Sequence, residues 1–366
     1  MTAAAGTGGR SWVVITDYPR WPSPYFAQLH RHAPPMLGLL FRPDLESLDD
    51  LESTMGPGII NLHRLKRLYR DASGARTLDA AQSMLDRLAG LRARGWRLVW
   101  TVHNVLPIDG AASRTADQAA ADGVLALAEM VLCHTAADAR ALGDRTNAEI
   151  TVAGWAGLGS PDERADAEVA AVVAMMRSTP ISILFLGHLT AYKEVPATLA
   201  AFLTHTRTAH LTIAGTCPDP RTATELTHLA ATAGGRVLLH LRHVAPGQTA
   251  HLYAATHAAV CPYRSDGKFA FFSEVLHPSS VGTAVCFRVP VIAPRLPAII
   301  EMTQDHPRWL AELGEIGPAF GAAETDLAAQ FRAGQDSRDE RGAPDGDDRW
   351  RQITRMYHLV AGKLSG

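Results

Sequence analysis

The chain has 366 residues, of which 47% are apolar and 20% are charged, and its formal net charge is −2. This length predicts two α/β domains rather than one small core, and the composition excludes a largely disordered protein. The near-neutral charge argues against a general nucleic-acid binder.

The first ten residues are rich in Ala, Gly and Thr, and we expect them to be disordered. They lack the apolar core of a signal peptide, and no later run is long enough to be a membrane-spanning helix. The four cysteines form no CxxC pair, which argues against a zinc knuckle. We therefore expect a cytoplasmic protein, and leave contact with a membrane surface and the oligomeric state open.

Short aliphatic runs alternate with amphipathic stretches through residues 11–158. Strands are predicted at Trp12–Thr16, Met36–Phe41, Ile59–Leu62, Arg97–Val102, Met130–His134 and Glu149–Ala153. Helices are predicted at Tyr25–His32, Leu78–Arg94 and Ala116–Ala128. This alternation is typical of a parallel sheet that is covered by helices on both faces.

The same alternation begins again after the stretch GWAGLGSPDERAD, where we place a linker, and it continues through a second domain at residues 159–334. Strands are predicted at Ile181–Leu186, His210–Ala214, Val237–Leu241, Ala258–Cys261 and Pro290–Ala293. Helices are predicted at Val195–Thr206, Pro220–Ala233, Gln248–Ala255, Gly282–Phe287 and Ala323–Arg332. Ligands in such domains bind beyond the carboxyl ends of the strands.

The stretch 335–348 is almost entirely polar and predicts a flexible loop. In the last segment, 349–366, apolar residues recur at helical spacing, and we expect a helix that packs back on the body.

The segment ILFLGHLTAYKEV combines three features of an anion site. Gly187 ends a strand and permits close approach of a ligand, Lys193 supplies a positive charge, and a helix begins near Val195. The other interpretation, an ordinary connection with a solvated lysine, has about equal weight.

In the segment HPSSVGTAV, Ser279 and Ser280 precede Val281, Gly282 and Thr283. Serine is a good N-cap, and glycine in the first turn of a helix permits phosphate to approach. A plain helix cap without a ligand is the alternative.

His103 and Asn104 follow a predicted strand of the first domain, where a general base or a sugar-binding group belongs. A buried histidine with satisfied hydrogen bonds is the alternative. Nearer the N-terminus, Trp21 and Tyr25 flank a proline-fixed loop, and they are predicted either to stack on a sugar or to pack within the loop.

The order of these segments resembles the retaining glycosyltransferases of the GT-B fold, in particular the large GT4 group. The landmarks in this chain read SPY (Ser23–Tyr25), LHRL (His63), TVHNVLPID (His103), LGHLTAYKE (Lys193), CPYR (Tyr263), PSSVG (Ser279, Ser280) and PVIAP (Pro290–Pro294). The resemblance covers about residues 11–305 and implies two Rossmann-like domains that face each other across a cleft.

The resemblance also implies roles for individual residues. Lys193 would hold the donor diphosphate, Gly187 would allow its approach, and the backbone of Ser280–Gly282 would cap the phosphates. Glu301 would lie near the donor ribose or sugar. Residues on the acceptor side would be Trp21, Tyr25, His63, His103 and Asn104, with His103 near the reacting carbon.

The chain departs from the group's pattern at three points. His188 replaces the usual arginine before the YK pair, and Glu194 replaces the glycine after the lysine. The Glu-x7-Glu signature is missing, because Gly282 stands eight residues after Glu274.

The function implied by the resemblance is transfer of a sugar from a nucleoside-diphosphate donor to a small-molecule or glycan acceptor, in natural-product or polysaccharide biosynthesis. No Asp-x-Asp pair follows a strand, so we expect neither a metal nor a cofactor besides the co-substrate. The alternatives are a non-catalytic partner protein of the same fold and a sugar-nucleotide epimerase. A dehydrogenase is disfavoured because no GxGxxG follows the first strand.

Overall fold

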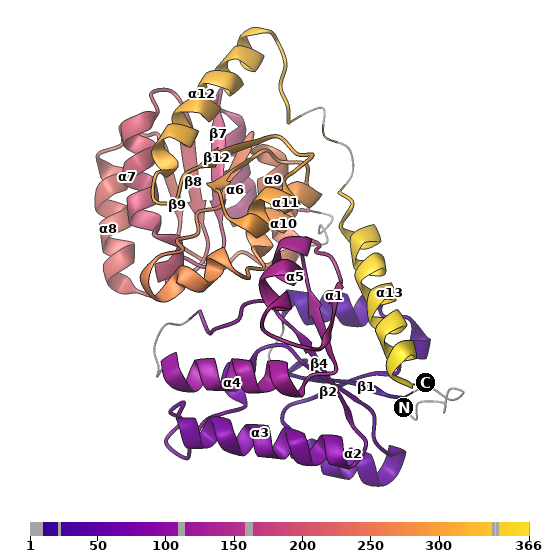
Figure 1. The fold of residues 1–366 in the computed structure, drawn as a ribbon. Helices are drawn as coiled ribbons and strands as arrows, with labels where there is room; N and C mark the ends of the chain where they lie inside the picture. The colour runs from indigo at the N-terminus through magenta and orange to yellow at the C-terminus, as the bar shows by residue number, and fades with distance from the viewer. Residues whose placement is uncertain are drawn as a thin grey trace. The chain divides into compact units, whose positions relative to one another are not determined.

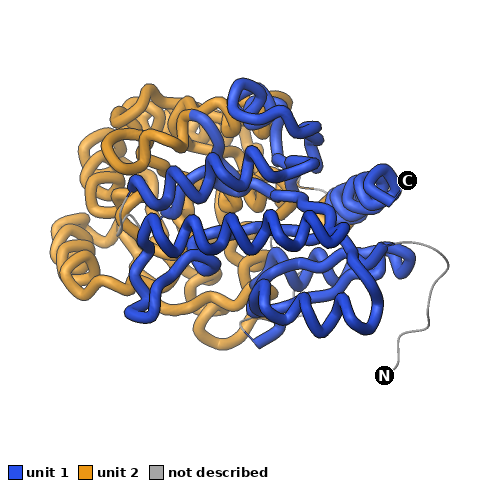
Figure 2. The backbone as a smooth tube through the Cα atoms, turned by 60° about the horizontal axis from the view of Figure 1, so that its bottom comes forward, with its two compact units in different colours: residues 1–155, 274–277, 348–366 blue, residues 156–273, 278–347 orange. Residues whose placement is uncertain are grey.

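The computed structural model describes residues 10–20, 23–108, 114–157, 164–338, 341 and 344–365 (Figure 1). The chain divides into two compact units (Figure 2). Unit 1 comprises residues 1–155, 274–277 and 348–366, and unit 2 comprises residues 156–273 and 278–347. The short stretch 274–277 is thus part of unit 1, although its neighbours in the sequence belong to unit 2.

Unit 1 is built on a parallel sheet with the strand order β2-β1-β3-β4-β5-β6. Its strands are β1 (Trp12–Ile15), β2 (Leu39–Arg42), β3 (Ile59–Leu62), β4 (Arg97–Thr101), β5 (Met130–Cys133) and β6 (Glu149–Val152). The strands β1, β3 and β5 are buried along their whole length, as expected of central strands in a sheet covered on both faces.

The helices of unit 1 lie on both faces of this sheet. They are α1 (Pro24–His32), α2 (Ser47–Met55), α3 (Leu78–Ala93), α4 (Arg114–Leu127), α5 (Ala136–Gly143) and α13 (Gly346–Ser365), with single 3₁₀ turns at Pro35–Leu37 and Leu65–Arg67. Figure 1 shows α2, α3 and α4 together on one face. The helix α13 is joined to the rest of this unit by a hydrogen bond of 3.0 Å between the hydroxyls of Tyr357 and Thr101, and by one of 2.9 Å from the hydroxyl of Thr354 to the carbonyl of His32.

Unit 2 contains a second parallel sheet, with the order β12-β11-β10-β7-β8-β9. Its strands are β7 (Ser182–Leu186), β8 (His210–Ala214), β9 (Val237–His240), β10 (Ala258–Val260), β11 (Val291–Pro294) and β12 (Arg308–Ala311). Its α-helices are α6 (Ala167–Arg177), α7 (Val195–His205), α8 (Pro220–Ala231), α9 (Thr249–Ala255), α10 (Ser279–Cys286), α11 (Pro297–Met302) and α12 (Ile316–Arg332). Its 3₁₀ segments are Ala191–Lys193, Pro246–Gln248 and Gly267–Ser273.

The main core of unit 2 lies between the sheet and the helices α7 and α12. Ile183 and Phe185 of β7 and Ile213 of β8 are fully buried there, as are Phe202 of α7 and Phe320 of α12. Phe202 and Phe320 meet edge to face, with 5.5 Å between their ring centroids. This core holds the carboxyl ends of β7 and β10 in fixed positions.

Several elements were not predicted from the sequence. The helices α2 and α5 are each about two turns long, and α2 buries only Leu48 and Leu51, so their periodicity is weak. The helix α6 follows the predicted linker directly, and α12 begins at Ile316 rather than at Ala323. None of the helices in the described residues is long and apolar enough to cross a bilayer.

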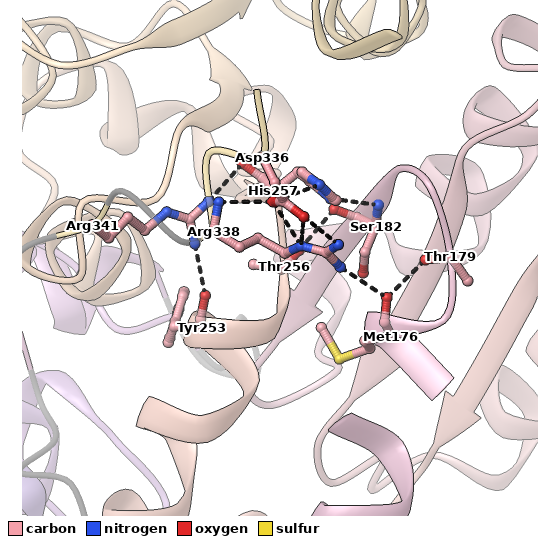
Figure 3. A network of polar contacts seen from close by, with 9 residues as sticks. All are labelled: Met176, Thr179, Ser182, Tyr253, Thr256, His257, Asp336, Arg338 and Arg341. Atoms are coloured by element: carbon pink, nitrogen blue, oxygen red, sulfur yellow. Dashed lines mark hydrogen bonds and ion pairs between the residues drawn. The ribbon is translucent and has the colours of Figure 1, made fainter. Parts of the chain in front are cut away.

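Part of the predicted flexible loop 335–348 packs against unit 2 (Figure 3). Asp336 accepts hydrogen bonds from Arg338 and lies 3.4 Å from Nε2 of His257. Arg341 donates to the backbone carbonyls of Tyr253 and His257, at 3.0 and 3.2 Å. Asp336, Arg338 and Arg341 of the predicted flexible loop therefore have partners within unit 2. The composition of the segment does not reveal these partners, because carbonyls near the end of α9 supply some of them.

Candidate active site

The strand order of unit 2 reverses direction between β7 and β10. From β7 the chain proceeds to β8 and β9 on one side, and then returns to form β10 on the other side of β7. Connections that leave two adjacent parallel strands in opposite directions leave a crevice beyond their carboxyl ends. The segment from Gly187 to Lys193 follows β7, and Cys261 to Tyr263 follow β10.

Two glycines with positive φ angles follow the neighbouring strands β7 and β8. Gly187 has a φ of 132°, and Gly215, which follows β8, has a φ of 136°. A Cβ atom on Gly215 would lie 2.0 Å from the carbonyl oxygen of Gly187, and a Cβ on Gly187 would lie 2.9 Å from Nζ of Lys193. The positive φ angles and the close packing of the two backbones favour glycine at both places.

Lys193 ends a single 3₁₀ turn, and its side chain is buried. Its Nζ lies 5.3 Å from the ring centroid of Phe185 and 6.0 Å from that of Tyr192. Among the residues that the structure describes, no carboxylate forms an ion pair with Lys193. The neighbouring Glu194 pairs with Arg264 instead, at 3.1 Å. A buried ammonium without a counter-ion is a strong attractor for an anion.

Ser280 and Lys193 both interact with the thiol of Cys261. Burial raises the pKa of the Cys261 thiol to about 11, while a hydrogen bond with Ser280 and the charge of Lys193 act in the opposite direction. The Ser280 hydroxyl also shares a hydrogen bond of 2.8 Å with the Tyr263 hydroxyl, and the Tyr263 ring stacks on Tyr192 at 5.8 Å. The structure thus brings together the two sequence segments that were predicted to hold a diphosphate.

The predicted serine cap is wrong in detail. The N-cap of α10 is Pro278, and no side chain caps the helix. Ser279 and Ser280 occupy the first turn instead. The hydroxyl of Ser280 shares a hydrogen bond with the hydroxyl of Tyr263. Val281, Gly282 and Thr283 follow in the helix and are buried. The positive end of the helix dipole remains at this position.

Other predicted donor residues lie nearby in sequence or on adjacent elements. His188 is exposed, and partial burial together with the charge of Lys193 lowers the pKa of its imidazole. Glu301 is half-buried on α11, which packs beside α10. Glu274 is counted with unit 1, where it pairs with Arg145 at 3.2 Å.

In unit 1, histidines follow three adjacent strands. His63 follows β3, His103 follows β4 and His134 follows β5, so the parallel sheet brings all three to the same edge. His277, from the stretch 274–277, joins them, and its backbone N–H donates to the carbonyl of His103 at 2.9 Å.

The four rings contact one another directly. Nε2 of His103 lies 2.9 Å from Nδ1 of His63, and Nδ1 of His103 lies 3.1 Å from Nε2 of His134 and 3.2 Å from Nδ1 of His277. Burial and neighbouring positive charge hold the pKa of His63, His103 and His277 well below the usual value of an imidazole. Burial also lowers the pKa of His134, to about 4. At neutral pH the rings are therefore uncharged and retain lone pairs.

The other residues predicted on the acceptor side have different environments in the structure. Tyr25 is buried, and its ring packs edge-on against His103 at 4.8 Å, while its hydroxyl shares a hydrogen bond of 3.2 Å with Tyr357. The buried Oδ1 of Asn104 has no hydrogen-bond partner within the described residues, which leaves an acceptor for a ligand. Trp21 lies outside the described residues.

Sequence reasoning missed His134, His277 and Gly215. The signal for His134 and Gly215 was available, since His134 ends the predicted strand Met130–His134, and Gly215 directly follows the predicted strand His210–Ala214 as Gly187 follows Ile181–Leu186. No signal identified His277, because only the return of residues 274–277 to unit 1 brings it to the other histidines.

Two Rossmann-like units of this topology define the GT-B fold, and comparison with solved structures agrees. Sucrose-phosphate synthase from Thermosynechococcus elongatus matches with a TM-score of 0.60 and 15% identity, over 87% of this chain and 76% of that one. HepE from Anabaena, in complex with UDP-glucose, matches with a TM-score of 0.57 and 12% identity, over 97% of each chain. AviGT4, a glycosyltransferase involved in avilamycin A biosynthesis, matches with a TM-score of 0.54 and 14% identity, over 98% of each chain.

These similarities confirm the prediction of an α/β GT-B fold with two domains. No family model and no curated protein matches the sequence.

Proposed function

We propose that the protein is a glycosyltransferase that binds a nucleoside-diphosphate sugar in unit 2 and transfers the sugar to a hydroxyl or amine of a small-molecule or glycan acceptor bound by unit 1. The observation that carries this proposal is the buried ammonium of Lys193, which pairs with no carboxylate of the described residues and lies near Cys261, after β10, and Ser280, at the start of α10.

The chemistry follows from charge. When the bond between the sugar and the diphosphate breaks, negative charge builds up on the leaving group, and Lys193 with the N-terminus of α10 stabilises that charge. We propose that this cation replaces a divalent metal at the donor diphosphate, and that the anomeric configuration is retained. His103 and Asn104 belong to the acceptor side of the reaction.

Two neighbours suggest the first substrates to test. The HepE complex contains UDP-glucose, so UDP-sugars are the first donors to try. AviGT4 is involved in avilamycin A biosynthesis, which supports natural-product tailoring as the first pathway to test, with surface-polysaccharide assembly as the second. We propose that the enzyme acts in the cytoplasm.

A second candidate is a non-catalytic partner protein of the same fold. The ion pair of Glu274 with Arg145 favours this candidate, because it holds the Glu274 carboxylate in unit 1, away from the proposed donor site in unit 2. Such a protein would bind no nucleotide. An epimerase would release an altered sugar nucleotide without any acceptor.

The substitution Lys193→Ala tests the donor site. We expect the affinity for the cognate nucleoside diphosphate to fall at least about 100-fold, because the desolvated diphosphate loses the ammonium of Lys193 as its counter-charge. Isothermal titration of purified protein with UDP, GDP, ADP and TDP measures this effect, and the titrations are repeated with EDTA to test metal-independent binding.

The matched control is Lys363→Ala, which removes an exposed lysine on α13 of unit 1 and should leave the affinity unchanged. Circular dichroism establishes that both variants are folded. If the wild-type chain binds none of these nucleotides, or if Lys193→Ala binds as tightly as wild type, the donor assignment is wrong.

A further inference from the structure

We propose that unit 1 binds one Zn²⁺ ion through Nδ1 of His103, Nε2 of His134 and Nδ1 of His277. These three nitrogen atoms all lie within 4.8 Å of one another. This inference goes beyond sugar transfer, since it concerns the histidine cluster of unit 1 and not the donor site of unit 2.

The first step is to locate the protons on the rings, starting from Trp12. Its indole N–H can only donate, and it lies 3.2 Å from Oδ1 of Asn61, which is therefore an acceptor. Nε2 of His63 lies 2.8 Å from the same oxygen and must carry its proton there. Nδ1 of a neutral His63 then has a lone pair, and Nε2 of His103 donates to it.

The second step follows from the remaining nitrogens. Because Nε2 of His103 carries the proton, its Nδ1 has a lone pair. Nδ1 of His134 donates to the carbonyl of Gly154 at 2.9 Å, so Nε2 of His134 also has a lone pair. These two lone pairs face each other across 3.1 Å. Buried acceptors that face each other without a donor are costly, and one proton from His277 can satisfy only one of them.

The spacing suits a cation placed between the rings. Ligands at 2.0–2.1 Å around a tetrahedral Zn²⁺ lie about 3.3 Å apart, close to the separations of 3.1 and 3.2 Å around Nδ1 of His103. Three protein ligands leave one coordination position, and His103 and His277 are only half-buried, so water or another small ligand can reach it.

The groups behind the ligands have the arrangement of a metal site. A metal-bound histidine usually donates its second ring N–H to a fixed acceptor, which sets the tautomer and the orientation of the ring. His134 donates to Gly154, His103 donates to His63, and His63 in turn donates to Asn61. Neutral imidazoles without any carboxylate or thiolate favour zinc and its neighbours in the first transition series over magnesium or calcium.

A metal here would join three separate pieces of unit 1: the ends of β4 and β5, and the stretch 274–277. That stretch is otherwise held by the N–H of His277 on the carbonyl of His103, by the N–H of Leu276 on Asp138, and by the exposed ion pair of Glu274 with Arg145. We therefore expect metal-free protein to melt at a lower temperature than zinc-loaded protein.

The experiment uses the full chain after treatment with a chelator and desalting at pH 7.5. Zn²⁺ is titrated calorimetrically, the bound metal is counted by elemental analysis, and Co²⁺ is added to a second sample to record the visible bands of four-coordinate cobalt. Zinc-edge X-ray absorption on the wild-type protein reads the ligand set without any substitution. We expect one equivalent of metal with three imidazole ligands.

The variants His277→Gln and His134→Gln each remove one ligand and should weaken zinc binding at least about 100-fold and abolish the cobalt bands. His228→Gln, at an exposed position on α8, is the matched control and should bind as wild type does. Nucleotide titrations on the same metal-free sample report separately on the donor site. If wild-type protein binds no zinc, the rings share a proton and the proposal is overturned. Absorption data that show other ligands, or unchanged binding by both folded variants, would overturn it equally.

Discussion

Glu194 holds a backbone conformation that residues other than glycine rarely adopt. Its φ is 42° and its ψ is 48°, at the junction between the turn that carries Lys193 and the helix α7. The family resemblance places a glycine here, and the structure supplies the physical reason, because the left-handed conformation costs an L-residue about 1–2 kcal/mol. The exposed ion pair with Arg264 recovers only part of this cost.

We predict that Glu194→Gly raises the free energy of unfolding by about 0.5–1 kcal/mol, because the strain exceeds the extra chain entropy of glycine. Removal of a carboxylate next to Lys193 should also tighten donor binding. Urea unfolding and nucleotide titration measure the two effects. Glu194→Gln is the control, since it removes the charge but keeps the strained backbone. A glycine variant that is less stable than the glutamine variant would contradict this account.

At the scale of elements, one carboxylate connects α5 to the stretch 274–277. Asp138 and Thr135 form a capping box at the start of α5, and the second oxygen of Asp138 accepts the N–H of Leu276 at 3.2 Å. Burial raises the pKa of Asp138 to about 6. Because Leu276 directly precedes His277, this contact places the fourth histidine of the cluster.

We predict that Asp138→Ala lowers the free energy of unfolding by about 3 kcal/mol, since it leaves the buried N–H groups of Thr135 and Leu276 without partners. Zinc affinity should fall with it, because His277 loses its anchor. Urea unfolding and zinc titration are the measurements. Asp144→Ala, at the exposed far end of α5, should change neither quantity by a comparable amount.

At the scale of the whole molecule, buried histidines make stability depend on pH. Nδ1 of His257 accepts the N–H of Ser182 at 3.0 Å, and its Nε2 faces Asp336 (Figure 3). Burial and the charges of Arg338 and Arg341 lower the pKa of His257 to about 4, although Asp336 acts in the opposite direction. Below pH 6.5 the unfolded chain therefore binds a proton that the folded chain does not.

We predict that the contribution of His257 to the free energy of unfolding is complete above pH 6.5 and declines by up to about 3 kcal/mol as the pH falls to 4. Urea unfolding of chelator-treated protein at several pH values measures the decline. His257→Asn keeps an acceptor for Ser182 but cannot take up the proton, so its slope should be shallower than that of wild type. Equal slopes would show that His257 does not titrate in this way. Asp138, with its raised pKa, opposes the trend below about pH 6 in both proteins.

The parallel sheets and the turn that carries Gly187 and Lys193 could be predicted because they depend on local signals. Buried runs of β-branched and aliphatic residues mark strands such as β7, and a strand end followed by glycine, lysine and a helix start marks an anion site. Gly187 and Lys193 therefore lie where the order of residues along the chain places them. Short helices such as α2 and α5 could not be predicted, because two turns bury too few residues to show a period.

The sequence by itself determined two Rossmann-like sheets, their order along the chain, and the pairing of a lysine-bearing turn with a serine-bearing helix. Only the tertiary structure decided that residues 274–277 belong to unit 1 and that His277 joins His103 and His134. It also decided that Arg338 and Arg341 pack against unit 2. The reason is that strands and turns follow from neighbours in the chain, whereas these contacts join residues more than eighty positions apart, which meet only when the unit that contains them has folded.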